Sequence, residues 1–229
     1  MDNQLSAPSD RYVLRAYRGA MKSDFKKKIQ TYAAKRGVFS VVTVPRLKFL
    51  MIDGHGDPNA AQAYKDALTT LYPVAYKLKF FSKTELGQDY GVMPLEALWW
   101  SDDMESFTSA RDKSRWDWTL MNMVPDWITL EHFKAARQNV AKKGEAPALE
   151  ALRIESLEEG LSVQTLHVGP YDDEGPVLEE MHNAFIPSQS LTMTGRHHEI
   201  YLGDPRRTAP EKLKTILRQP VTPVTPSTG

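Results

Sequence analysis

The chain of 229 residues has no cysteine, no net charge and no apolar run long enough to span a bilayer. The missing cysteine excludes disulfides, cysteine zinc sites and thiol nucleophiles. Because 29 basic residues balance 29 acidic ones, no long-range field attracts nucleic acid. The sequence also lacks the apolar core of a signal peptide. We therefore expect a soluble cytoplasmic protein without a nucleic-acid or membrane partner.

Both ends of the chain have the composition of poorly ordered segments. Residues 1–20 are polar with few apolar anchors, and Met21 begins a new charged stretch. We expect an extension over 1–20 that is disordered or not native, ahead of one domain over 21–220. Residues 220–229 are rich in proline, threonine and serine, which predicts a frayed tail, with 221–229 outside the domain.

The first half of the domain, over 45–124, has the pattern of a βαββ unit. Residues 45–53 form a mostly apolar run that predicts a buried strand, and the turn-forming residues 54–58 follow it. A helix is expected to begin near Asn59. Its apolar face has i, i+3, i+4, i+7 spacing and consists of Tyr64, Ala67, Leu68 and Leu71. The aromatic and apolar runs 92–101 and 116–124 then predict a hairpin.

The second half, over 162–217, repeats this order. A strand is expected at 162–168, and helical spacing returns at Leu178, Met181, His182 and Phe185. Strands at 196–202 and 213–217 complete the unit. Residues 129–143 and 148–155 between the halves have helical composition and predict a linking helical hairpin. The fold class is therefore α+β, built from tandem βαββ repeats.

A glutamate lies inside an apolar, aromatic strand in each half. Side chains alternate along a strand, so Glu96 shares a face with Leu98 and Trp100. In the second half, His197, Glu199 and Tyr201 share a face by the same rule. A carboxylate beside aromatic rings costs several kcal/mol if it is buried unpaired. Each glutamate must therefore face water, a charged partner or a ligand cavity.

Two interpretations of these strands stay open. Either glutamate can pair with a neighbouring arginine, lysine or histidine on an exposed sheet face. Alternatively, it lines an apolar cavity, where burial increases the proton affinity of a carboxylate enough for general-base catalysis near neutral pH. Most of the five tryptophans are expected to be core filling. Trp100 is assigned to a cavity because it shares a face with Glu96.

Motifs for metals and nucleotides are missing from the sequence. No two histidines have the i, i+4 spacing of helical zinc ligands, and His197 and His198 point to opposite sides of one strand. The short Gly54-His55-Gly56 turn does not form a phosphate-binding loop. We expect neither a metal nor another cofactor.

Three strings together resemble one family. KFLMIDG at 48–54, PLEALWW at 94–100 and HHEIYLGDPRR at 197–207 are similar to GyrI-like proteins of the free-standing type, and the similarity covers about residues 21–221. The resemblance implies two βαββ units related by a pseudo-twofold axis, with a ligand groove between them. Family members include effector domains of multidrug-responsive regulators. Free-standing members are implicated in hydrolysing cyclopropane-bearing, DNA-alkylating natural products.

The resemblance implies a cofactor-free hydrolase that acts on a flat, apolar small molecule. Glu199 is then the base that activates water, with Tyr201 or Tyr76 as a hydroxyl donor. The remaining expected ligand contacts are Glu96, Trp100 and His197. The competing hypotheses are a non-catalytic drug-binding or sequestration protein, which takes flat apolar or cationic molecules in the same groove, and an effector-sensing domain. The oligomeric state is left open.

Overall fold

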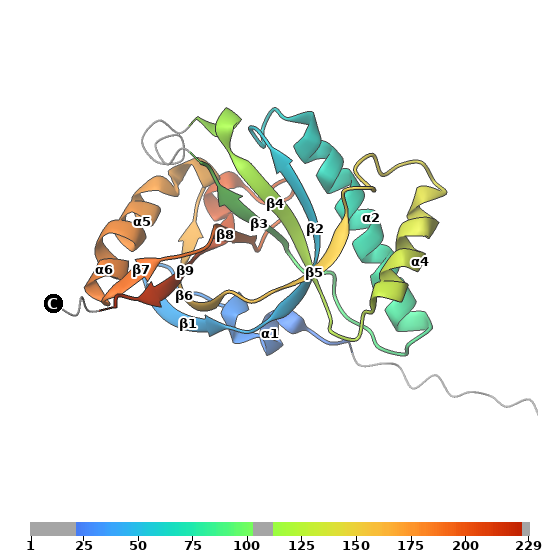
Figure 1. Cartoon of the computed structure of the whole chain (residues 1–229), viewed down its shortest axis with the longest axis horizontal. Coiled ribbons are helices and arrows are strands. Elements are labelled where there is room, and N and C mark those ends of the chain that lie inside the picture. The colour runs from blue at the N-terminus through green and yellow to red at the C-terminus, as the bar shows by residue number, and fades with distance from the viewer. Residues whose placement is uncertain (1–21, 103–111, 226–229) are drawn as a thin grey trace, which may run out of the picture.

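The computed structural model describes residues 22–102 and 112–225. The predicted extension over 1–20 and residues 226–229 of the predicted tail lie outside this range. Within the described residues, nine strands form one antiparallel sheet in the order β1-β6-β9-β8-β3-β4-β2-β5, and β7 pairs with β9 outside this path. Helices lie near both ends of the sheet, with α2 and α4 at one end and α5 and α6 at the other (Figure 1).

The first half of the described chain consists of a short N-terminal segment followed by six strands and helical segments. That segment contains α1 (Phe25–Lys28) and the 3-10 turn η1 (Gln30–Tyr32). The elements that follow are β1 (Ser40–Val44), β2 (Leu47–His55), α2 (Gln62–Thr84), β3 (Leu95–Trp100), the 3-10 turn η2 (Lys113–Arg115) and β4 (Asp117–Val124).

The second half begins after α4 (Leu130–Ala141), which packs on α2. Its strands are β5 (Arg153–Leu157), β6 (Gly160–Val168), β7 (Leu191–Met193), β8 (His197–Tyr201) and β9 (Lys214–Pro223). Its helical segments are η3 (Tyr171–Asp173), α5 (Gly175–Glu179), the π-helical η4 (Glu180–Phe185), α6 (Ile186–Ser188) and η5 (Pro210–Lys212).

The strand order of the second half mirrors that of the first. Reading outward from the centre of the sheet, β3, β4 and β2 lie on one side, and β8, β9 and β6 lie on the other. The halves meet where β3 pairs with β8, in a register that sets Leu98 opposite His198 and Ala97 opposite Glu199. The side chains of this central strand pair therefore belong to both halves at once.

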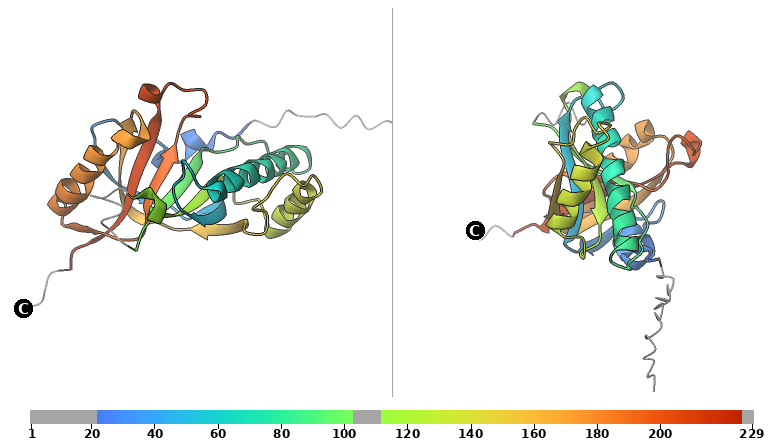
Figure 2. Two further views of the ribbon diagram at one scale, coloured as in Figure 1. Left: turned by 90° about the horizontal axis from the view of Figure 1, so that it is seen from above. Right: turned by 90° about the vertical axis from the view of Figure 1, so that its right-hand side faces the viewer.

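Each face of the sheet is covered by different elements. On one face, α2 buries a helical stripe that includes Ala67, Leu71, Val74 and Leu78 against the sheet, while Met181 and Ile186 pack on β6 and β9. Figure 2 shows α2 and α4 as a layer beside the strands. The opposite face is covered by the N-terminal segment, where Tyr32 joins a methionine-rich core with Met51 and Met121.

Two parts of the predicted element order are wrong. The expected helical segment 148–155 is wrong at its end: residues 153–155 lie in β5, which pairs with β2 from Leu47 to Met51. The tail was expected to fray from Pro220, yet β9 continues to Pro223 and Val221 is buried. Pro220 lacks an N–H but keeps its place by accepting a hydrogen bond from the Thr194 N–H at 2.9 Å.

The other predicted elements are present with adjusted limits. The first helix begins at Gln62 rather than near Asn59, and the second is divided into α5, η4 and α6. The strand β1 has no counterpart among the predicted elements. Among the described residues, no helix is both long and apolar enough to cross a membrane.

Candidate functional site

A large cavity lies between the helices of the two halves. Its volume is about 1560 Å³, and its lining includes residues of α2, of the segment from η3 to η4, and of the central strands β3 and β8. The two central strands supply Trp99, Glu199 and Tyr201 to this lining. The cavity therefore lies where the two halves of the sheet meet, on the face that carries the helices.

Aromatic rings dominate the part of the lining around β3 and β8. Tyr64 of α2 stacks on Trp99 with ring centroids 6.3 Å apart and an interplanar angle of 18°. Trp116 meets Trp99 edge-on at 5.7 Å, and Tyr171 meets Tyr201 edge-on at 5.4 Å. All five residues line the cavity. Flat aromatic walls of this kind favour a flat apolar ligand.

A hydrogen-bonded chain runs through this aromatic wall and ends at a carboxylate. The Trp99 Nε1–H donates to the Tyr201 hydroxyl oxygen at 3.1 Å. The Tyr201 hydroxyl in turn donates to Glu199 Oε2 at 2.6 Å. The Glu199 side chain is 13% exposed, so the carboxylate is largely shielded while remaining in contact with the cavity. The Tyr201 hydroxyl holds this carboxylate in one orientation.

The phenols that surround Glu199 keep their protons at neutral pH. Burial, followed by the negative charge of Glu199, raises the pKa of Tyr201 and of Tyr64 well above the usual value of a phenol. Burial and then Glu174 and Glu199 raise the pKa of Tyr171 to about 12. Each of these hydroxyls is therefore a hydrogen-bond donor.

Two histidines, His197 and His182, lie near the Glu199 carboxylate. His197 Nε2 is 3.6 Å from Glu199 Oε1, and its ring meets that of His182 edge-on at 5.9 Å. His182 belongs to the π-helical η4 and lines the cavity. Burial and then His197 lower the pKa of His182 to about 4, so His182 is neutral at physiological pH.

Ion pairs hold the rim of the cavity. Lys113 of η2 reaches across to Asp172 of η3 at 2.7 Å, joining the two halves. Asp204 is held by Arg206 through two side-chain contacts of 2.9 and 3.0 Å, and Arg206 lowers the pKa of Asp204 to about 2. Among the described residues, no cluster of three or more potential ligands could hold a metal ion.

Three of the predicted site residues line the cavity: Glu199, Tyr201 and Tyr76. Tyr76 differs from the other two because it is half exposed and stacks on Phe80 along α2. It therefore lies at the mouth of the cavity, away from the buried carboxylate. His197 is buried next to Glu199 but is not part of the lining.

Trp100 and Glu96 do not line the cavity, contrary to the expectation that they form its slot. Alternation along β3 places Trp99 on the cavity face and sends its even-numbered neighbours to the other side. There the Trp100 ring is covered by the Arg196 guanidinium, 3.5 Å from the ring centroid. Glu96 is fully buried, accepts a hydrogen bond from the Tyr32 hydroxyl at 2.6 Å and forms an ion pair with His198.

Trp99, which takes the place assigned to Trp100, is not among the predicted site residues, and neither are Tyr64 and Tyr171 of the wall. Trp99 and Trp100 are adjacent in β3, so their side chains point to opposite faces of the sheet. For α2 a signal exists in the sequence, since Tyr64, Leu68, Tyr72 and Tyr76 recur every four residues and all line the cavity. Such a stripe marks one helix face.

Solved structures resemble the whole described fold. A Listeria innocua protein without an assigned activity is 38% identical with a TM-score of 0.80, covering 88% of this chain and 100% of its own. Two further structures from the same organism, each named as a hydrolase, are 37% and 38% identical, with TM-scores of 0.74 and 0.77 and the same coverage. No curated protein matches the chain.

The family comparison agrees with this geometry. Residues 38–222 match the family described as the GyrI-like small molecule binding domain. The matched region contains the central strands, α2 and the η3–η4 segment, and therefore the whole set of cavity walls described above. The chain belongs to the family of GyrI-like small-molecule-binding domains.

Proposed function

We propose that the protein binds a flat, apolar or cationic small molecule in this cavity and hydrolyses cyclopropane-bearing, DNA-alkylating toxins there. The observation that carries the proposal is the placement of Glu199: a shielded carboxylate, oriented by Tyr201, in a wall of aromatic rings. The rings accommodate the planar part of the toxin, and the carboxylate meets the water that attacks it.

The reaction needs no oxidant and no cofactor. A strained cyclopropane fused to a dienone is opened when the oxygen of water bonds to a ring carbon. The carbon–carbon bond of the ring breaks, and its electron pair makes the dienone a phenolate. Glu199 takes a proton from the attacking water, and the phenolate oxygen gains a proton, so the product is the toxin plus one water. General-base help of this kind contributes roughly 10² to 10⁴-fold to a rate.

The hydroxyl groups divide this work between them. The Tyr201 hydroxyl donates a hydrogen bond to Glu199, so we assign Tyr201 the role of positioning the base. Tyr64 and Tyr171 line the same cavity with protonated hydroxyls and are our choice for donors to the developing phenolate oxygen. Tyr76 at the mouth is then a contact for the outer part of the ligand.

The relatives support hydrolysis as the type of reaction. The two structures named as a hydrolase from Listeria innocua share 37% and 38% of their residues with this chain and are covered along their full length. The reaction class is carried over from those proteins, whereas the substrate comes from the free-standing members of the family that the sequence resembles.

Mass spectrometry of a cyclopropane-bearing alkylator tests the proposal. We expect incubation with the protein to convert the alkylator into a species heavier by one water molecule, faster than in buffer. A mass that stays unchanged in the presence of saturating protein would contradict hydrolysis.

A binding-only function is the second candidate. The carboxylates of Glu174 and Glu199 lie in the same lining as the aromatic rings, and this combination fits a cationic aromatic molecule. A sequestration protein or an effector-sensing domain would use that fit without chemistry. In the same experiment it would slow the loss of the alkylator and leave its mass unchanged.

The two halves, about 45–124 and 162–217, are proposed to be βαββ repeats related by a pseudo-twofold axis. The mirrored strand order on either side of the β3–β8 pair supports this proposal. An internal superposition is expected to lay β2, α2, β3 and β4 on β6, the η3–α6 segment, β8 and β9. Helices that fail to superpose when the strands are aligned would contradict the repeat.

A further inference from the structure

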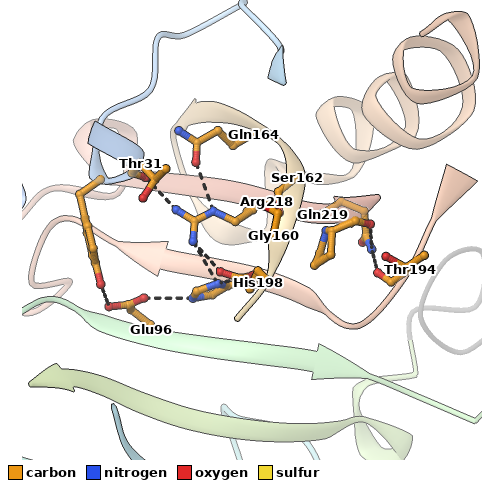
Figure 3. Close-up of polar contacts among 12 residues, drawn as sticks. Thr31, Glu96, Gly160, Ser162, Gln164, Thr194, His198, Arg218 and Gln219 are labelled. Atoms are coloured by element: carbon orange, nitrogen blue, oxygen red, sulfur yellow. Dashed lines mark hydrogen bonds and ion pairs between the residues drawn. The ribbon is translucent and has the colours of Figure 1, made fainter. Parts of the chain in front are cut away.

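Four ionisable side chains are buried on the face of the sheet that is opposite the cavity. We call Glu96, Glu159, His198 and Arg218 the ionic cluster. Their side chains are at most 4% exposed, and the two carboxylates balance the two cations when His198 is protonated. Figure 3 shows Glu96, His198 and Arg218 of this cluster, with Thr31 beside Arg218. No step of the proposed reaction uses any of these residues.

The geometry around His198 favours a charged imidazole, because an acidic side chain lies near each ring nitrogen. Its Nδ1 lies 2.9 Å from Glu159 Oε1, and its Nε2 lies 3.1 Å from Glu96 Oε2. Ionised carboxylates only accept hydrogen bonds, and a neutral imidazole has a single N–H. A neutral His198 would therefore set a lone pair against one of the two carboxylates.

Arg218 completes the charge balance from the next strand. Its Nη1 donates to Glu159 Oε2 at 2.8 Å, and its Nε donates to Gln164 at 3.2 Å. Its Nη2 donates to the Thr31 carbonyl at 2.7 Å, which fastens the N-terminal segment to the sheet. The guanidinium thus has a partner on every side.

The cluster spans the junction between the two halves of the sheet. In the strand register Gln164 lies opposite Arg218, Arg218 opposite His198, and His198 opposite Leu98 of β3. Glu96, two residues from Leu98 on the same face, reaches His198 diagonally. The ion pair between Glu96 and His198 therefore ties β3 to β8 directly under the cavity.

We propose that His198 is a positioning residue for the cavity, because its ion pairs with Glu96 and Glu159 fix the β3–β8 strand pair that carries Trp99, Glu199 and Tyr201 on its other face. The neighbours in sequence make the connection short. His198 precedes Glu199 on β8, and Trp99 lies three residues from Glu96 on β3. The inference rests on the cavity being the binding site and is independent of whether bound molecules are hydrolysed.

The protonation of His198 gives this coupling a pH signature. Burial alone would lower the pKa of His198, but the carboxylates of Glu159 and Glu96 outweigh burial and raise the pKa to about 9. The charged groups that face His198 are Glu96, Glu159 and Arg218, and Tyr32 adds a hydroxyl that donates to Glu96. Above pH 9, two carboxylates would share one cation.

The indole N–H of Trp99 reports on the cavity face without any ligand, since it donates to Tyr201. We propose to follow its NMR resonance in ¹⁵N-tryptophan-labelled full-length protein, assigned with Trp99→Phe. In the wild type, the resonance is expected to move with the titration of the His198 imidazole, near pH 9. Glu96→Gln keeps the shape of the side chain and removes one carboxylate. In this variant the pH midpoint of the Trp99 shift and that of the His198 titration are expected to fall together.

His198→Gln supplies the direct test, and Asp89→Asn is its matched control. Asp89 is also buried in an ion pair, 3.2 Å from Lys79, but neither residue lines the cavity. At pH 7 we expect the Trp99 resonance to shift in His198→Gln and to stay in place in Asp89→Asn. An unchanged Trp99 resonance in folded His198→Gln would overturn the proposal.

The titration keeps the proposal testable if His198→Gln does not fold. A Trp99 resonance that ignores the His198 titration in the wild type, or that keeps its midpoint in Glu96→Gln while that of His198 falls, would also overturn it. Failure of the proposed hydrolysis would be visible separately, as an unchanged mass of the alkylator, and would leave these NMR outcomes unaffected.

Discussion

The two faces of the β3–β8 strand pair each hold a glutamate, and different neighbours close over them. Glu199 faces the cavity, with phenols and an indole around it and no lysine or arginine among its ion-pair partners in the described residues. Glu96 faces the N-terminal segment and is neutralised by His198 within a buried network. A carboxylate in an aromatic strand can therefore serve a ligand or serve the fold, depending on what covers its face.

Because of this difference, substitutions on the two faces are expected to affect different properties of the protein. Removing a charge from the closed face leaves an unpaired partner in the interior, so the cost falls on stability. Changing a group on the open face alters what the cavity contacts, so the cost falls on binding or turnover.

The largest effect is expected for Arg218→Met, which leaves the buried Glu159 carboxylate with one cation fewer. We expect the free energy of unfolding to fall by about 3 to 5 kcal/mol, measured by urea denaturation. Arg137→Met is the control, because its ion pair with Glu150 is largely exposed and should contribute less than about 1 kcal/mol. Equal losses in the two variants would remove the distinction between the closed face and the surface.

The pH dependence of stability comes next. The pKa of His198 is about 9 in the folded protein against 6.5 in an unfolded chain, so its contribution is complete below pH 6.5 and is lost as the pH rises through 9. The loss should be on the order of 3 kcal/mol. Burial alone would raise the pKa of Glu159, yet His198 and Arg218 lower it to about 2. Stability therefore also decreases as the pH falls from 4.5 toward 2.

Denaturant unfolding between pH 6 and 10 measures the alkaline part of this dependence. His198→Gln should be less stable at pH 7 and should lack the decline between pH 6.5 and 9. If the variant retained the same decline as the wild type, the titration would belong to another group.

Replacing the adjacent tryptophans separates the two faces by affinity. Trp99→Phe is expected to weaken binding of thioflavin T, a flat aromatic cation, by about 5 to 10-fold, because stacking and the indole hydrogen bond are lost. Trp100→Phe should change affinity less than about 2-fold. Fluorescence titration gives both constants, and a larger effect at Trp100 would place the binding surface on the other face.

The smallest effect is expected at the rim. Lys113→Met removes the ion pair with Asp172, but the Asp172 side chain is 76% exposed, so we expect less than about 1 kcal/mol of stability to be lost. Urea unfolding at low and at high salt checks this. A loss above about 2 kcal/mol at low salt would show that the rim pair holds the halves together.

Much of the element order could be predicted from the sequence because periodicity follows burial. The four-residue pattern of α2 and the apolar runs of β2 and β4 each match one buried surface. Residues 148–155 contain good helix formers, but pairing with β2 places residues 153–155 in a strand. The local sequence of that segment does not indicate that it pairs with β2, about a hundred residues earlier in the chain.

The candidate site could be predicted only in part for a related reason. Strand β3 is apolar at both even and odd positions, and both its faces are buried, so alternation cannot tell which face meets the cavity. The sequence assigns Trp100 to the cavity because it shares a face with Glu96, but that face is the closed one. In β8, the partly exposed Glu199 and Tyr201 share one face, and both side chains line the cavity.

The most direct test of the account compares the two glutamates in one assay of ring opening. Glu199→Gln keeps the shape of the side chain and removes the base, so turnover of the cyclopropane-bearing alkylator should fall by roughly 10²-fold or more with its binding little changed. Glu96→Gln, assayed below its melting temperature, should retain turnover within about 5-fold, because its carboxylate lies outside the cavity lining and affects the reaction only through the position of the strands. A Glu199→Gln variant that hydrolyses as fast as the wild type, or a Glu96→Gln variant that loses as much activity as Glu199→Gln, would contradict it.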